Sequence, residues 1–95
     1  MPEPIDSWII TPHATLRMRE RRITTRMLAE VLQAPEQRFT ARPGRDILQG
    51  HVRRDGEWYL LRVFVDVDRT PAEVASLYCT TRIHRYWRTD DESAL

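Results

Sequence analysis

Three residues able to do acid–base and phosphate chemistry follow one another at intervals of four: His13, Arg17 and Arg21. At about 100° per helical residue, this spacing places them on one side of a helix, beside an apolar stripe that includes Leu16 and Met18. Imidazole exchanges protons near neutral pH, and guanidinium groups bind phosphate, so the line predicts the floor of an anion-binding cleft. The alternative is structural, with the arginines tying the helix to carbonyls or carboxylates elsewhere in the domain.

A second group of candidates follows from the Asp55-Gly56 dipeptide, which is typical of a two-residue hairpin turn. Pairing residues across this turn and applying strand alternation separates an apolar face, suited to contact with helices, from a mixed one. The mixed face carries imidazole, guanidinium and indole groups: His51, Arg53, Trp58 and Arg62. Such a composition can stack on RNA bases and hydrogen-bond to them. The alternative is an ordinary outer sheet face, partly covered by the C-terminal segment.

The elements that must position these residues follow from capping signals and periodicity. Thr11-Pro12 predicts a helix to about Arg22, and Thr24 predicts a second helix that runs through Ala34 and ends before Pro35. A period of two then predicts four strands and a short helical or irregular segment: residues 37–41, 45–54, 57–67, 72–80 and 82–87. Residues 5–10 form a weaker candidate for an additional strand. We expect an α+β domain, with two N-terminal helices packed on a four-stranded antiparallel sheet.

The register of the last strand has two solutions. A four-residue reversal before it, residues 68–71, turns Val74, Ser76 and Tyr78 towards the helices. A five-residue reversal instead buries Ala75, Leu77 and Cys79 and sets Tyr78 beside Arg62. The apolar side chains favour the second, which we adopt. Whether Tyr78 reaches the first helix stays open.

Composition limits the class of protein. The 95 residues suit a single domain, expected to span 1–95 with an ordered core at about 5–88 and an acidic tail at 89–95. All 15 basic residues are arginine, and residues 1–88 hold 15 arginines against 11 acids, which permits nucleic-acid binding but also suits a GC-rich genome. No apolar run approaches the roughly 18 residues of a membrane span, and the acidic N-terminus is unlike a secretory signal. One cysteine and three scattered histidines predict neither disulfide, metal site nor cofactor, and we expect a cytoplasmic protein.

Several of these residues also resemble a bacterial family of small domains of unknown function that share a His-x3-Arg-x3-Arg helix. The first helix carries the resemblance through Thr11-Pro12-His13-Ala14, Arg17-Met18, Arg21 and Ile23-Thr24. Residues 59–63 and 76–82 resemble that family's third and fourth strands. The layout is similar to BrnT and, more distantly, to the RelE/ParE toxin superfamily, over roughly residues 11–87.

The resemblance implies a toxin of a toxin–antitoxin pair, or a relative that lost activity, with RNA (ribosome-bound mRNA in RelE-like members) and a cognate antitoxin as partners. It implies a metal-independent endoribonuclease in which His13 is the acid or base and Tyr78 is a proton donor or stacking platform. Arg17, Arg21 and Arg82 would hold the phosphate. Two departures weigh against activity: the chain has no lysine, and Arg22 stands where the family has a helix-ending glycine. The alternative is a non-catalytic interaction module, and the sequence leaves homo-oligomer formation open.

Overall fold

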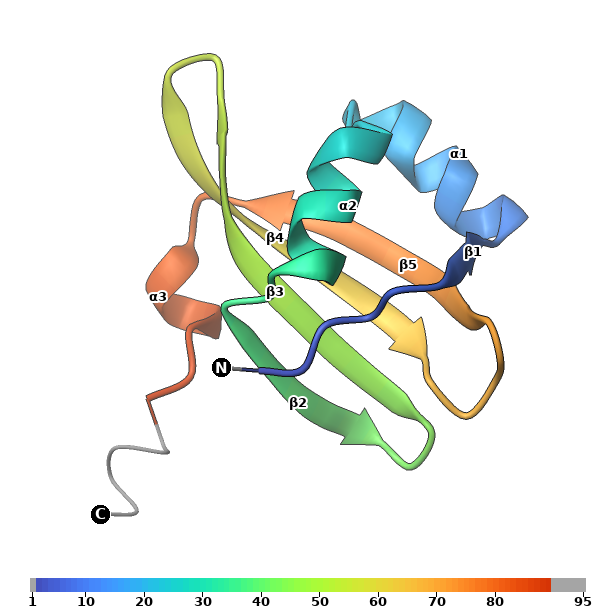
Figure 1. The fold of residues 1–95 in the computed structure, drawn as a ribbon. Coiled ribbons are helices and arrows are strands. Elements are labelled where there is room, and N and C mark those ends of the chain that lie inside the picture. Colours follow the sequence, from blue (N-terminus) through green and yellow to red (C-terminus); the bar gives the residue numbers. More distant parts are fainter. Residues whose placement is uncertain (1, 90–95) are drawn as a thin grey trace.

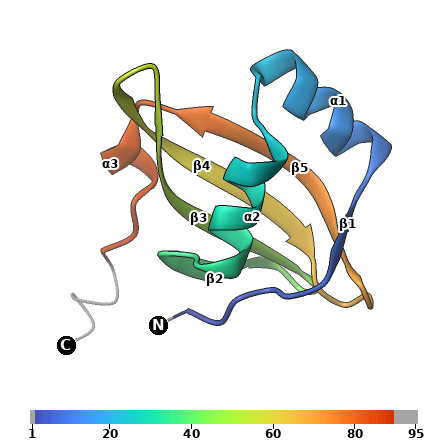
Figure 2. The ribbon, with the colours of Figure 1, turned by 45° about the horizontal axis from the view of Figure 1, so that its top comes forward.

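The computed structural model describes residues 2–89, so most of the expected acidic tail lies outside the described residues. The fold is a sheet that carries the two N-terminal helices on one face and a short third helix on the other (Figures 1 and 2). In chain order the elements are β1 (Trp8–Ile10), α1 (Pro12–Arg21), α2 (Thr25–Gln33), β2 (Gln37–Arg42), β3 (Arg45–Arg54), β4 (Glu57–Asp66), β5 (Ala72–Thr80) and α3 (Ile83–Tyr86). The α+β class and both N-terminal helices are confirmed.

Local capping explains where the first two helices begin. The Thr11 hydroxyl accepts a hydrogen bond from the Ala14 amide at 3.1 Å, and the Thr24 hydroxyl accepts one from the Met27 amide at 3.1 Å. These bonds satisfy amides that have no partner within their own helix. Helix α1 ends at Arg22, which adopts the left-handed conformation with φ 57°. Both helix starts therefore follow the sequence prediction.

The β3–β4 register also follows the prediction from the Asp55-Gly56 turn. Arg54 pairs with Glu57, and the pairing continues without a shift to Arg45 and Asp66. One face of this hairpin packs beneath α2, while α1 packs on β5, and this face supplies much of the core through Leu48, Val52, Leu61 and Val63. The other face, hereafter the α3 face, is the one that α3 covers.

The predicted four-stranded antiparallel sheet is wrong in one respect, because the sheet has five strands in the order β1-β5-β4-β3-β2 and is mixed. Strands β2 to β5 form the expected antiparallel meander, while β1 pairs in parallel with β5. This pairing joins Trp8 to Ala72 across more than 60 residues. β1 has three residues, too few to show the alternation of buried and exposed side chains that marks a strand. Its pairing with β5 depends on how the chain passes through both helices, which the sequence of β1 does not indicate.

Strand β5 combines the two registers that the sequence allowed. A bulge lies between the Phe64–Ser76 and Val65–Val74 pairs. Before the bulge, Val74 is buried, as the shorter reversal requires. Ala75 is only half-buried, so the prediction from the longer reversal that Ala75 is buried is wrong. Beyond the bulge, Leu77 is buried and Tyr78 pairs with Arg62, as the longer reversal predicted. One extra residue in the strand thus lets both ends bury an apolar side chain.

Candidate nucleic-acid interface

The three residues of the predicted α1 cleft have separate surroundings. His13 and Arg21 are exposed, and the half-buried Arg17 forms an ion pair with Glu20 of the same helix. The Nη1 of Arg21 donates to the Leu77 carbonyl oxygen at 2.8 Å. Within residues 2–89, no hydrogen bond joins any two of the three. These three residues lie beside the buried apolar stripe of α1 and do not form the floor of a common cleft. The reason is that Arg17 and Arg21 each bind an acceptor close by, Glu20 and the Leu77 carbonyl.

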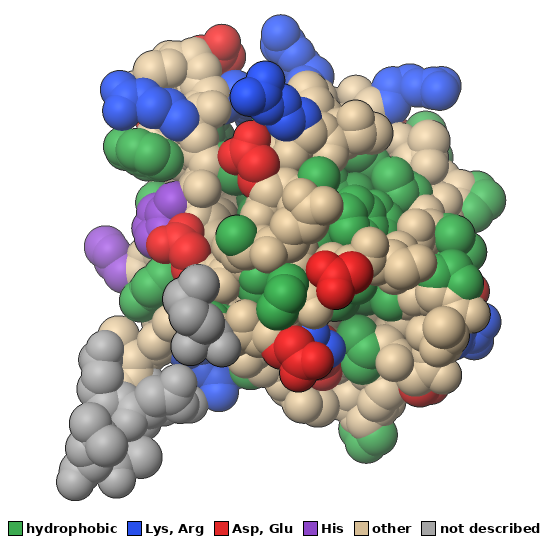
Figure 3. Space-filling view, in the orientation of Figure 1, with side chains coloured by type: hydrophobic (Ala, Val, Ile, Leu, Met, Phe, Trp, Pro, Cys, Tyr) green, Lys and Arg blue, Asp and Glu red, His purple; other side chains and the backbone are tan. Residues whose placement is uncertain are grey.

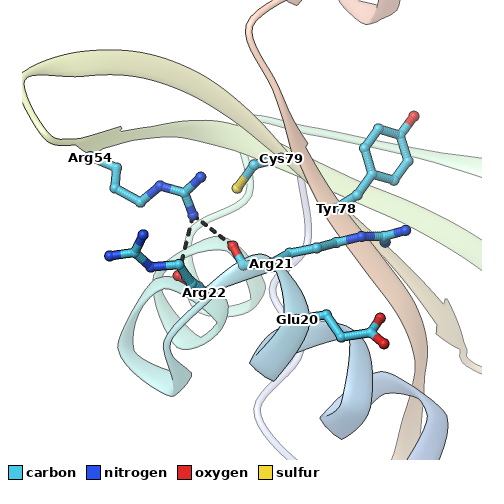
Figure 4. Close-up of a pocket in the computed structure, with 6 residues that line it drawn as sticks. All are labelled: Glu20, Arg21, Arg22, Arg54, Tyr78 and Cys79. Atoms are coloured by element: carbon cyan, nitrogen blue, oxygen red, sulfur yellow. Dashed lines mark hydrogen bonds between the residues drawn. The ribbon is translucent and has the colours of Figure 1, made fainter.

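A shallow pocket of ≈ 550 Å³ at the C-terminal end of α1 does bring Arg21 and Tyr78 near each other (Figure 4). The other lining residues are Glu20, Arg22, Arg54 and Cys79. The Nη1 of Arg54 donates to the carbonyls of Arg21 at 2.9 Å and Arg22 at 3.2 Å, which satisfies the end of the helix. The hydroxyl of Tyr78 is directed away from this group in Figure 4. Tyr78 therefore cannot complete a catalytic set with the α1 residues.

Cys79 in the same pocket is a poor nucleophile. Its side chain is half-buried and packs against the core. Burial raises the pKa of the Cys79 thiol, and this effect outweighs the opposing influence of Arg54. The thiol therefore stays protonated near neutral pH, in keeping with the core position expected for it.

Arg62 lies beneath α3 at the centre of the α3 face and is 8% exposed, so it is not the surface contact that we predicted. Its Nε donates to Gln49 Oε1 at 2.8 Å, and its Nη1 donates to the Tyr78 hydroxyl at 2.7 Å. Its guanidinium also lies 4.4 Å from the centroid of the Tyr86 ring. Among residues 2–89, no carboxylate forms an ion pair with Arg62. In the part of the chain that the structure describes, the buried charge of Arg62 thus has neutral partners alone, an arrangement that favours a nearby anion.

Gln49, which the sequence analysis did not single out, connects this arginine to α3 and β2. Its side chain is fully buried. While its oxygen accepts from Arg62, its nitrogen donates to Gln37 Oε1 at 2.7 Å and to the Tyr86 carbonyl at 3.1 Å. The register set by the Asp55-Gly56 turn already places Gln49 opposite Arg62, as observed. Nothing near Gln49 in the sequence indicates its other two partners, because Gln37 and Tyr86 belong to β2 and α3.

His51 lies at the edge of the α3 face and makes a close pair with Glu36. Glu36 Oε1 accepts from the His51 backbone N–H at 2.5 Å and lies 2.9 Å from Nδ1 of the ring. The imidazole stands edge-on to Trp58, with centroids 6.4 Å apart, and tilted against Trp87 at 4.9 Å. Glu36 was missed, whereas Trp87 belongs to the C-terminal segment that was expected to cover part of this face. The expected turn at residues 42–45 held a partial signal for Glu36. The β2–β3 pairing shifts by one residue between Thr40 and Arg42 and sets Gln37 opposite Gln49, so that Glu36 precedes β2 close to Gly50 and His51.

Positively charged side chains surround this edge, and most of them stack on aromatic rings. The guanidinium-to-centroid distances are 5.2 Å for Arg53 and Trp58, 5.6 Å for Arg85 and Tyr86, and 4.3 Å for Arg88 and Phe39. Arg82 is exposed at the start of α3. Strand carboxylates on the same face already have cationic partners, Arg45 for Asp66 and Arg69 for Glu73. The face therefore has an excess of positive charge among planar groups.

Figure 3 shows where this surface lies. Histidine side chains (purple) occupy the left edge of the molecule, beside hydrophobic surface (green) and a carboxylate (red). This is the side on which α3 and the β3–β4 hairpin lie in Figure 1. Of the predicted RNA contacts, His51, Arg53 and Trp58 are thus exposed together, Arg82 is exposed at the start of α3, and Arg62 is buried below them.

Comparisons with family models, with curated proteins and with solved structures found no match for this chain. Within residues 2–89, no cluster of three or more histidine, cysteine, aspartate or glutamate side chains could bind a metal ion. No helix in that part of the chain has the length and apolar character needed to span a bilayer.

Proposed function

We propose that this protein binds single-stranded RNA on the α3 face and acts there as a toxin-like, metal-independent endoribonuclease. The observation that carries the proposal is Arg62, a buried cation with no carboxylate partner in residues 2–89, beneath a surface of stacked arginine and aromatic side chains. The uncompensated positive charge of Arg62 would attract a phosphodiester to the surface above it, and the exposed indole of Trp58 would receive a base.

The binding test measures the fluorescence anisotropy of a labelled single-stranded RNA over a range of salt concentrations. Affinity should fall steeply with salt, because each phosphate contact releases counterions. Trp58→Ala should weaken binding by about 5- to 150-fold, the range that corresponds to about 1–3 kcal/mol for one stacked base. Leu16→Ala is the matched control, because Leu16 is similarly exposed but lies on α1. Equal losses in both variants, or no affinity even at low salt, would contradict RNA binding.

The toxin part of the proposal has a cellular test. Expression in a bacterial host should arrest growth and should cleave cellular RNA. Coexpression of the protein encoded by a neighbouring gene should relieve the arrest if that gene is the cognate antitoxin. If the host grows normally and its RNA stays intact while folded protein accumulates, the toxin activity is contradicted. RNA binding is then still decided by the anisotropy test.

The competing candidate is a non-catalytic interaction module in which the arginines are structural. The hydrogen bonds of Arg21 to the Leu77 carbonyl and of Arg54 to the end of α1 favour it. In that case Arg21→Ala lowers the unfolding temperature, and the wild-type protein shows no RNA affinity at any salt concentration. The two candidates are therefore separated by the anisotropy measurement alone.

A further inference from the structure

His51 stands between two shallow hollows on the α3 face. The larger, of ≈ 590 Å³, is lined by Glu36, His51, Trp58 and Ile83. The smaller, of ≈ 280 Å³, is lined by His51, Ile83, His84 and Trp87. Each hollow thus has one indole wall, and the imidazole of His51 belongs to both. Two stacking surfaces separated by a titratable ring suit two successive nucleotides with their phosphodiester at the ring.

Glu36 determines which ring nitrogen of His51 is available. A carboxylate only accepts hydrogen bonds, so the 2.9 Å contact of Oε1 with Nδ1 requires the proton to be on Nδ1. The lone pair of a neutral ring is then on Nε2. Within residues 2–89, no hydrogen bond occupies that nitrogen. The same carboxylate oxygen accepts from the backbone N–H of His51, which further restricts the orientation of the pair.

We infer that His51 is the general base of an RNA-cleaving site, with Glu36 as its positioning residue and with bases seated against Trp58 and Trp87. The inference rests on the proposed function and moves its catalytic centre from α1 to the α3 face. His84, the second imidazole of the smaller hollow, is the general acid. The substrate is a single-stranded RNA with a free 2′-hydroxyl at the cleaved step.

The chemistry balances without a further reactant. Nε2 of His51 takes the proton of the 2′-hydroxyl while that oxygen bonds to the adjacent phosphorus. The bond between phosphorus and the 5′-oxygen breaks, and the departing oxygen receives a proton from His84. The products are a 2′,3′-cyclic phosphate and a 5′-hydroxyl end. Arg53, 5.2 Å from the centroid of Trp58, places a guanidinium beside the larger hollow, where negative charge accumulates.

The kinetic test uses a short labelled single-stranded RNA, with RNA affinity and unfolding temperature measured for every variant. His51→Gln should lower kcat by about 10²- to 10⁴-fold, the usual contribution of a general base, with little change in KM. His51→Asn serves as a second variant if the first is unstable. Added imidazole should restore part of the activity of His51→Ala, because the hollows on both sides leave room for it. An oligonucleotide with a 2′-deoxyribose at the cleaved step should bind and stay intact.

Positioning by Glu36 has its own readout. Glu36→Ala should lower kcat with KM nearly unchanged, whereas Glu36→Gln, which keeps an oxygen acceptor for Nδ1–H, should retain most of the activity. Equal loss in both variants with equal loss of stability would assign Glu36 a merely structural role and overturn this part.

The outcomes separate the inference from the function on which it rests. Cleavage that survives in folded His51 variants overturns the inference alone, and loss with His13→Ala instead returns the catalytic centre to α1. Binding without cleavage by the wild-type protein overturns the inference and the nuclease activity but leaves RNA binding in place. If the wild-type protein does not bind RNA, the inference, the nuclease activity and RNA binding are all overturned.

Discussion

Arginine side chains in this protein differ mainly in what accepts their hydrogen bonds. Arg45 meets a carboxylate, with its Nε 2.7 Å from Asp66 Oδ1, whereas Arg62 meets an amide and a hydroxyl. The first arrangement neutralises charge, and the second preserves it. Arg62 thus keeps a positive charge that attracts anions to the α3 face, and Arg45 contributes to the pH dependence of stability.

The Arg45–Asp66 pair predicts how unfolding depends on pH. The hydrogen bond from Arg45 holds the pKa of the Asp66 carboxyl below its ordinary value of 3.8. The resulting stabilisation is fully present above the pKa of the unfolded chain and is lost as pH falls through the folded pKa. Asp66→Asn should therefore flatten the pH dependence of the free energy of urea unfolding on the acid side of about pH 5. Asp6→Asn, at an exposed position, should keep the wild-type slope, and identical slopes for all three proteins would refute the assignment.

Among the secondary-structure elements, α1 ends on a residue type that does not suit its backbone conformation. Arg22 has φ 57°, a conformation that costs a residue with a Cβ atom roughly 1–2 kcal/mol but that glycine adopts readily. Arg54 compensates in part by donating to the carbonyls of Arg21 and Arg22. Because glycine adopts this conformation at lower cost, it would suit the position better than arginine.

Arg22→Gly should accordingly stabilise the protein by about 0.5–1 kcal/mol, after allowance for the greater freedom of glycine in the unfolded chain. Arg22→Ala is the control, because it removes the same charge but keeps the Cβ atom. Thermal and urea unfolding should rank glycine above both arginine and alanine. If alanine gains as much as glycine, loss of charge rather than relief of backbone strain is responsible.

For the whole molecule, α3 is the element whose docking joins the core to the proposed interface. Its Tyr86 carbonyl accepts from the fully buried Gln49, and its Tyr86 ring covers Arg62. Since Gln49 also bonds to Gln37 and Arg62, one side chain links β2, β3, β4 and α3. The orientation of the hollows around His51 therefore depends on a buried polar network.

Gln49→Met keeps a similar volume but removes all three of these hydrogen bonds. We expect a loss of about 1–3 kcal/mol, because Arg62 loses an acceptor in a buried position. Amide exchange at Arg85 and Trp87, whose N–H groups bond within α3, should accelerate more than exchange in β4. Leu60→Met is the control, since it also changes a fully buried residue of the α3 face but breaks no hydrogen bond. Equal acceleration in both variants would show that α3 is not held through Gln49.

Features set by neighbouring residues could be read from the sequence. Thr11 and Thr24 each cap the helix that follows by accepting from an amide three residues on. Asp55-Gly56 sets the register of β3 against β4, and this register separates the core face from the face with His51 and Arg53. Each depends on hydrogen bonds or alternation within one or two elements, and these are specified locally.

Only the tertiary structure decided what each candidate side chain touches. The parallel pairing of Trp8 with Ala72, the bulge in β5, the burial of Arg62 under α3 and the contact of Glu36 with His51 all join separate segments. Their energies depend on which groups are excluded from water together, and that follows from packing the whole chain. For the same reason the arginines of α1, aligned in sequence, face separate partners, whereas His51 and Trp87, 36 residues apart, come within 4.9 Å.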